Sequence, residues 1–131
     1  MATKNSRPLS PHLTIWKWGP HMLTSILHRV TGGALSIAGL ALLTWWLVAL
    51  SSGPEDYATF TRVAGHPVGL FVLIGLTWAF FQHLLSGVRH LTMDSGAALE
   101  LNDSKRFSVL TVVGGIVLTA LLWAYILGVR S

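Results

Sequence analysis

The chain has 131 residues, of which 52% are hydrophobic and only 11% are charged, and it contains no cysteine. Because soluble domains carry about 25% charged residues, this composition indicates a membrane protein. A chain without cysteine cannot bind an iron–sulfur cluster through thiolates or form a disulfide, so any redox role needs a cofactor held by other ligands. The formal net charge of +4 does not indicate nucleic-acid binding, because the basic residues are scattered around the apolar segments.

Three long segments contain no Asp, Glu, Lys or Arg, and together they make up about half of the chain. They cover residues 30–50, 68–88 and 107–129. Each is long enough to cross a hydrocarbon layer of about 30 Å as an α-helix with a rise of about 1.5 Å per residue. The connections are too short to hold a soluble domain. We therefore predict an all-α integral membrane protein with three transmembrane helices and a single membrane-anchor domain over residues 1–131.

Residues 1–19 form a polar and basic segment ahead of the first apolar run. Pro8 and Pro11 argue against one continuous helix, and Trp16 and Trp18 are typical of the membrane interface. We expect an extended arm along the membrane surface. The segment has no apolar stretch of the signal-peptide type, so we expect the first span to direct insertion, most simply into a bacterial inner membrane.

The first transmembrane helix is expected over about residues 22–50. Pro20 is favourable in its first turn, because the amide that proline lacks would be unpaired there. A track of small residues follows, which lets membrane helices approach closely; it consists of Gly32, Gly33, Ser36 and Gly39. The polar connection after this helix has room for a short surface helix around residues 55–63.

Two further transmembrane helices are expected over about residues 67–93 and 107–128. The nine Lys and Arg residues are distributed unevenly around the spans, with seven on the side of the N-terminus and two on the opposite side. Because cytoplasmic segments carry the excess of Lys and Arg, we predict a cytoplasmic N-terminus and a periplasmic C-terminus.

His83 is an ionisable residue inside the second apolar run, about 9 Å before Arg89 by helical rise. Ionisable residues at this depth are costly in lipid and usually face the interior of a helix bundle. Each is therefore a candidate functional residue. The side chain can be a ligand to haem or another metal, a proton carrier, or a structural group bonded to a neighbouring helix. Gly87 lies on the same helix face and is expected to leave room beside the imidazole for a flat group.

A low-spin haem has two axial ligands, and this chain is expected to supply only one of them. His90 lies two helical turns from His83, about 10.5 Å along the axis, which is too far to share one iron. His28 and His66 are placed near opposite membrane faces, at the wrong depth. If His83 binds haem, the second ligand is therefore expected from another chain.

Ser25, His28 and Arg29 fall at the cytoplasmic end of the first helix, with Ser25 and Arg29 on one face. Two interpretations remain open. Arg29 can be an ordinary charge flanking a transmembrane helix. Alternatively, His28 and Arg29 pair with the propionates of a haem, and Ser25 with Arg29 hydrogen-bonds a quinone carbonyl. Arg89 is interpreted as an anchor at the end of the second helix, with Asp94 as a helix cap or as its partner.

Three motifs occur in order: RPLSPHLTIWKW at residues 7–18, SILHRVTG at residues 25–32 and HLLSGVRHLTMD at residues 83–94. Together they resemble the cytochrome b subunit of succinate dehydrogenase, the larger of its two membrane anchors. The opening motif is similar to the mitochondrial and related α-proteobacterial branch. The resemblance covers nearly the whole chain, and its specificity comes from the three motifs at the expected spacing rather than from any one of them.

The resemblance implies site residues at the matching positions. His83 falls on the axial ligand of haem b, with the other ligand supplied by the second, smaller anchor subunit. Ser25 and Arg29 fall on part of the ubiquinone site beside the iron–sulfur subunit. His28, with Arg29, falls on the group associated with the haem propionates. The resemblance assigns no role to His90 and Asp94.

The resemblance also implies partners. A soluble flavoprotein subunit oxidises succinate, an iron–sulfur subunit passes electrons to ubiquinone, and this chain anchors both in the lipid bilayer without containing the catalytic centre. Three alternatives remain at the level of the sequence. The chain can be the anchor of a quinol:fumarate reductase, a purely structural anchor without haem, or a small transporter component.

Overall fold

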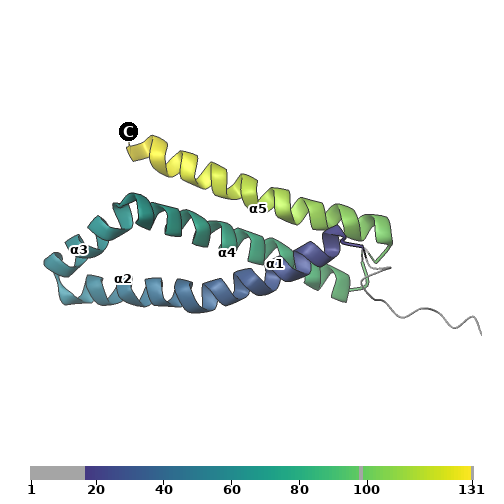
Figure 1. The fold of residues 1–131 in the computed structure, drawn as a ribbon, viewed down its shortest axis with the longest axis horizontal. Coiled ribbons are helices and arrows are strands. Elements are labelled where there is room, and N and C mark those ends of the chain that lie inside the picture. Colours follow the sequence, from purple (N-terminus) through teal and green to yellow (C-terminus); the bar gives the residue numbers. More distant parts are fainter. Residues whose placement is uncertain (1–16, 98, 131) are drawn as a thin grey trace, which may run out of the picture.

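The computed structural model describes residues 17–97 and 99–130. The arm expected over residues 1–19 lies outside this range except for its last three residues, which have no regular secondary structure. The remaining described residues form an all-α fold (Figure 1), with helices α1 (Pro20–Ala34), α2 (Leu40–Ser52), α3 (Pro54–Gly65), α4 (Pro67–Asp94) and α5 (Leu101–Arg130), and a π-helical turn η1 (Leu35–Gly39) between α1 and α2.

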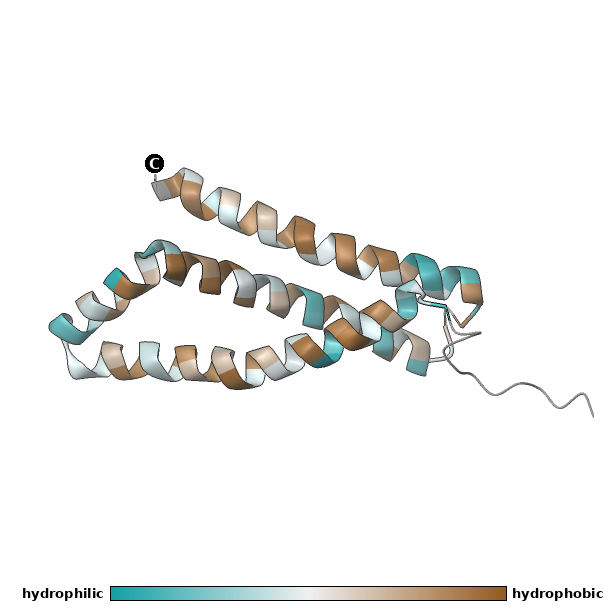
Figure 2. Ribbon diagram, viewed as in Figure 1, coloured by the Kyte–Doolittle hydropathy of each residue, from teal (hydrophilic) through white to brown (hydrophobic). Residues whose placement is uncertain are grey.

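Three of these segments are long and apolar enough to cross a membrane. They are Pro20–Ser52, which joins α1, η1 and α2 into one continuous helix, then Pro67–Asp94 and Leu101–Val129. Each contains an 18-residue stretch whose mean hydropathy is 1.9, 1.8 and 2.2, respectively, and Figure 2 shows apolar residues along most of each helix. The prediction of an all-α membrane protein with three transmembrane helices is confirmed.

Proline and glycine set the helix boundaries. Pro20, Pro54 and Pro67 each occupy the first turn of a helix, where the missing amide is not needed. The break between α2 and α3 falls at Gly53, whose φ of 124° is unfavourable for other residues. His66 caps α4, because its side chain accepts a hydrogen bond from the amide of Val68 at 3.3 Å.

The third transmembrane helix is longer than the sequence pattern suggested. α5 begins at Leu101 rather than at about residue 107. Its first turn carries Asp103, and a negative charge there interacts favourably with the helix dipole. The charge-free run therefore marked the part of the helix that suits hydrocarbon, whereas the helix itself extends beyond it.

α4 lies at the centre of the arrangement. It packs against α5 along one side and against α1 on the other, and α1 also contacts α5 (Figure 1). α2 continues from α1 but diverges from α4, and among the described residues it makes no close contact with α4 or α5. α3 connects the far end of α2 back to the start of α4. The three helices therefore meet closely only at the end that contains α1.

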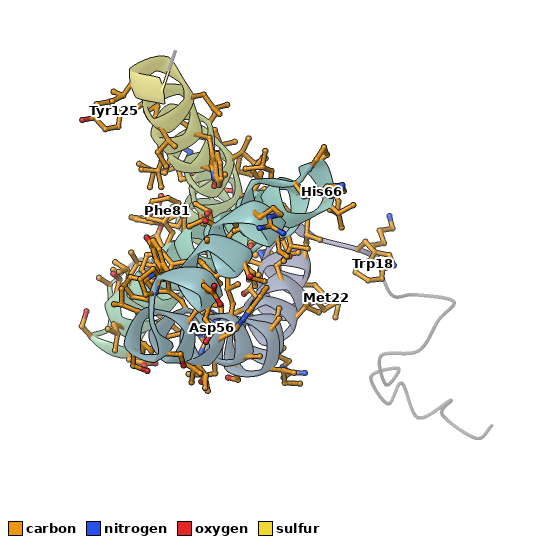
Figure 3. All side chains as sticks on the ribbon, turned by 90° about the vertical axis from the view of Figure 1, so that its left-hand side faces the viewer. Trp18, Met22, Asp56, His66, Phe81 and Tyr125 are labelled. Carbon is orange, nitrogen blue, oxygen red and sulfur yellow. The ribbon has the colours of Figure 1, made fainter. Side chains whose placement is uncertain are left out.

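The interior of the fold is polar and its surface is apolar. Only Ala49 and Ala79 are buried hydrophobic residues among those described, whereas the buried polar residues are Thr24, Thr31, Gln82, Ser86, Arg89, Ser104, Ser108, Thr111 and Thr119. The large apolar side chains point outward, as Tyr125 does in Figure 3. This inversion is expected in lipid, where helices associate through small residues and interhelical hydrogen bonds rather than through the hydrophobic effect.

Glycine allows α5 to approach α4. A Cβ atom at Gly115 would lie 3.0 Å from Oε1 and 3.3 Å from Cα of Gln82, which is itself fully buried. Gly114 is less restricted, because a Cβ there would lie 2.9 Å from Cδ1 of Leu85, the end of a flexible side chain. Gly115, which faces backbone atoms of α4, therefore sets the distance between the two helices.

We expect Gly115→Leu to separate α4 from α5 and to destabilise the protein by about 1–3 kcal/mol, the usual cost of overpacking. The measurement is the thermal denaturation midpoint in detergent. Gly75→Leu is the matched control, because Gly75 lies within α4 and an added Cβ there meets no atom within 4 Å. Equal midpoints for the two variants would show that Gly115 does not set the helix spacing.

Candidate functional site

Three histidine rings are stacked where α1 crosses α4. The ring centroid of His28 lies 4.0 Å from that of His83, with an interplanar angle of 8°, and 6.1 Å from that of His90, with an angle of 18°. Since His83 and His90 are about 10.5 Å apart along α4, His28 lies between them. The site thus combines one histidine from α1 with two from α4.

The expectation that His28 lies at a different depth from His83 is wrong. It rested on the distance of each residue from the end of a charge-free run. Counted from the helix ends, His28 is eight residues into α1 and His83 is eleven residues before the end of α4. These offsets correspond to about 12 and 16.5 Å of helical rise, and the stacking of the two rings shows that they lie at the same level.

α1 fixes both the orientation and the tautomer of His83. Its Nδ1 lies 3.1 Å from the backbone oxygen of His28 and 3.3 Å from Oγ1 of Thr31. The Thr31 hydroxyl donates to the carbonyl of Leu27 at 2.6 Å. Because a carbonyl oxygen only accepts, Nδ1 carries the hydrogen and Nε2 keeps its lone pair. A histidine whose Nδ1–H is held in this way presents Nε2 as a ligand for a metal.

A glycine lies beside each of the two rings, and the one at Gly32 is required for space. A Cβ atom at Gly32 would lie 2.9 Å from Cε1 of His83, so no side chain fits there without moving the ring. Gly87, which was expected to make room beside His83, instead lies beside His28, where a Cβ would be 3.8 Å from Cε1. The small residue next to His83 therefore belongs to the facing helix. Of the expected small-residue track, Gly33 has no atom within 4 Å of an added Cβ.

His28 is held from the other side by Ser86. Its Nδ1 lies 2.7 Å from Oγ of Ser86, and this hydroxyl donates to the carbonyl of Gln82 at 2.7 Å. With its hydrogen used in that bond, the buried Ser86 oxygen accepts the hydrogen of His28 Nδ1. The contact orients the His28 ring through a residue that was not among the predicted site residues.

A small polar cavity of about 140 Å³ adjoins the histidine stack. It is lined by Thr24, Ser25, His28 and Arg29 from α1 and by Ser86, Arg89 and His90 from α4. The structure thus brings Ser25, His28 and Arg29 together with His90. Two guanidinium groups and two imidazoles line the cavity and no carboxylate does, which suits an anionic oxygen ligand.

Three larger cavities have a different character, and one of them, of about 460 Å³, lies on α5 beside Lys105, Arg106, Val109 and Leu110. Another of about 590 Å³ lies between α2, α3 and α4, and one of about 390 Å³ lies between the start of α1 and α5. Most lining residues of these last two are apolar, although Arg62 and His66 line the larger one. Chemistry rather than volume therefore identifies the polar cavity as the candidate site.

Arg89 is not the surface anchor that the sequence suggested. Its side chain is 8% exposed, and Nη2 donates to Oγ of Ser104 at 3.0 Å, which ties α4 to α5. Asp94, its suggested partner, is exposed at the end of α4. The available signal was the spacing of Gln82, Ser86 and Arg89 at i, i+4 and i+7, a polar stripe on one face of an apolar helix.

Within the described residues, no group of three or more His, Cys, Asp or Glu side chains can hold a metal ion. A haem needs less from one chain, because the porphyrin supplies four nitrogen ligands and only the axial positions remain. A single imidazole with its Nε2 lone pair presented by a hydrogen-bonded Nδ1 fits one of those positions.

The chain is similar to proteins of known families. Residues 3–122 match the family described as succinate dehydrogenase/fumarate reductase transmembrane subunit. The succinate dehydrogenase cytochrome b556 subunit of Paracoccus denitrificans is 41% identical over 118 residues, which is 90% of both chains. The corresponding Rickettsia felis protein is 39% identical over 91% of this chain and 92% of its own length. The mitochondrial cytochrome b560 subunit of Mus musculus is 37% identical over 76% of this chain and 59% of its own length.

Proposed function

Because the chain belongs to the family of succinate dehydrogenase and fumarate reductase transmembrane subunits and is similar to their cytochrome b subunits, we propose that it provides one axial ligand to haem b and part of a ubiquinone-reduction site. Its role as a membrane anchor follows from the family and from the three apolar helices.

His83 is the proposed axial ligand. The supporting observation is the hydrogen bond from its Nδ1 to the backbone oxygen of His28, which leaves Nε2 as the coordinating atom. When bound, haem b supplies a one-electron carrier. The second axial ligand comes from the smaller anchor subunit, because His28 and His90 are engaged in the same stack as His83.

His28 and Arg29 are the proposed partners of the haem propionates. Both line the polar cavity next to His83, and a guanidinium pairs with a carboxylate through strong, charge-assisted hydrogen bonds. In a medium without water, such pairing compensates for burying the carboxylate.

Ser25 and Arg29 are the proposed quinone ligands. Both side chains are exposed on α1 at the edge of the polar cavity, so they can reach a substrate that enters from outside this chain. A hydroxyl and a guanidinium that donate to a quinone carbonyl stabilise the negative charge that develops when the quinone is reduced. This arrangement serves quinone reduction and quinol oxidation equally, so the anchor of a quinol:fumarate reductase is the alternative function.

The proposed partners are the smaller anchor subunit, the iron–sulfur subunit and the flavoprotein subunit, and the last of these carries the centre for succinate oxidation. The soluble subunits dock at the end of the bundle where Ser25 and Arg29 lie. In a bacterial inner membrane this end is the cytoplasmic one, with the C-terminus of the chain in the periplasm, as the distribution of Lys and Arg indicates.

The test of haem ligation is a reduced-minus-oxidised visible spectrum of the purified complex. We expect a b-type signal in the wild type, its loss or shift in His83→Ala, and its retention in the control His66→Ala, since His66 lies at the opposite end of α4. An intact wild-type complex without a haem signal would leave this chain as a structural anchor.

The contact between Gly32 and His83 makes a second prediction. Gly32→Ala places a methyl group 2.9 Å from Cε1 of His83, so the ring must move, and we expect a lower haem content or a shifted spectrum. The neighbouring Gly33→Ala is the matched control, because an added Cβ there meets no atom within 4 Å. Identical haem content and spectra in both variants and the wild type would contradict the assigned position of His83.

Loss of a quinone ligand is expected to separate two activities. In Ser25→Ala and Arg29→Ala, ubiquinone reduction should fall about tenfold or more, since removal of one donor to a developing oxyanion costs about 10²–10³ in kcat. Succinate oxidation with an artificial acceptor should be unchanged. Ser36→Ala is the control for an exposed serine on the same helix. A parallel loss of both activities would argue against the site.

A further inference from the structure

Arg89 is a buried cation whose partner in this chain is neutral. Its side chain is 8% exposed, and Nη2 donates to the hydroxyl of Ser104 at 3.0 Å. Within the described residues, Nε is buried and has no hydrogen-bond partner. A guanidinium that is removed from water without a compensating anion carries a large cost. The missing partner is therefore expected to be an anion from outside this chain.

The position of Arg89 indicates where that anion binds. Arg89 lines the polar cavity of about 140 Å³ together with Arg29 and His28, and no carboxylate lines this cavity. The cavity thus has a cation on each of two helices, an exposed one on α1 and a buried one on α4. A carboxylate between them would receive charge-assisted hydrogen bonds from both sides.

The two arginines differ in how firmly they are held. The bond from Nη2 to Ser104 fixes one edge of the Arg89 guanidinium against α5, and Arg89 also lines the polar cavity. Arg89 follows His83 by six residues, about 9 Å of rise and about 120° around α4. It nevertheless lines the same cavity as His28, whose backbone oxygen accepts the hydrogen bond of His83, so the cavity adjoins the proposed haem ligand.

We propose that Arg89 is a further haem-binding residue, whose guanidinium donates to a propionate carboxylate in the polar cavity while Ser104 holds one edge of the guanidinium. This assignment rests on the proposed function, because it requires haem b to be bound at His83. Ser104 is then a positioning residue, which acts on the haem only through Arg89.

The test compares haem b with its dimethyl ester, in which the propionates cannot accept a charge-assisted hydrogen bond. The complex is assembled in haem-deficient cells supplied with either compound, and the rate of haem transfer to apomyoglobin is measured. We expect Arg89→Gln to accelerate the loss of haem b by about ten- to a hundredfold, the range for losing a hydrogen bond to a charged group, and to leave the loss of the ester unchanged.

Two milder variants keep the test informative if Arg89→Gln does not assemble. Arg89→Lys retains the charge but cannot bond Ser104 and the propionate in the same way, and Ser104→Ala retains the arginine but releases it. Both should accelerate the loss of haem b by a smaller factor and spare the ester. Arg62→Gln, in α3 at the other end of the bundle, should change neither rate.

Three other results would contradict the proposal for Arg89, and each has a different meaning. Equal acceleration for haem b and its ester would show that Arg89 only supports the fold, and unchanged rates for both would remove it from the haem site. A raised KM for ubiquinone with unchanged haem loss would place the Arg89 guanidinium at the quinone site instead and overturn the proposal. A wild-type complex without haem would instead contradict the proposed function itself.

Discussion

The crossing of α1 over α4 is the contact on which the candidate site depends. At this point the backbone oxygen of His28 accepts the hydrogen of His83 Nδ1, and the two rings stack at 4.0 Å. The approach is possible because Gly32 has no side chain where the His83 ring lies. One backbone contact thus sets the tautomer of His83, the depth of His28 and the position of the cavity that contains Ser25 and Arg29.

The polar interior follows from the same physics. In lipid, apolar side chains gain little from facing one another, so the helices meet through glycine, serine and threonine. Most buried hydroxyls bond a carbonyl of their own helix, as Ser108 does with Ser104 and Thr119 with Gly115. The hydroxyls are thus satisfied within their own helices, and Arg89, whose bond to Ser104 crosses between helices, is the most costly of the buried side chains.

Part of the candidate site faces away from this chain. Ser25 and Arg29 are exposed on one side of the cavity, Arg89 is buried on the other, and among the described residues α2 makes no close contact with α4 or α5. These features agree with membership of a family of transmembrane subunits. We infer that neighbouring subunits complete the environment that this chain only begins.

The sequence alone determined the class of protein and the number of spans, because a scarcity of charge and three uncharged runs leave few other solutions in a membrane. Its motifs also indicated the family, which the comparisons support. The tertiary structure decided which side chains meet. It placed His28 at the depth of His83 and buried Arg89 against Ser104. It also showed that the glycine beside the His83 ring is Gly32, whereas the sequence pattern predicts Gly87. Contacts between helices depend on where each helix begins and on the angle at which two helices cross. The spacing of residues along one helix determines neither of these.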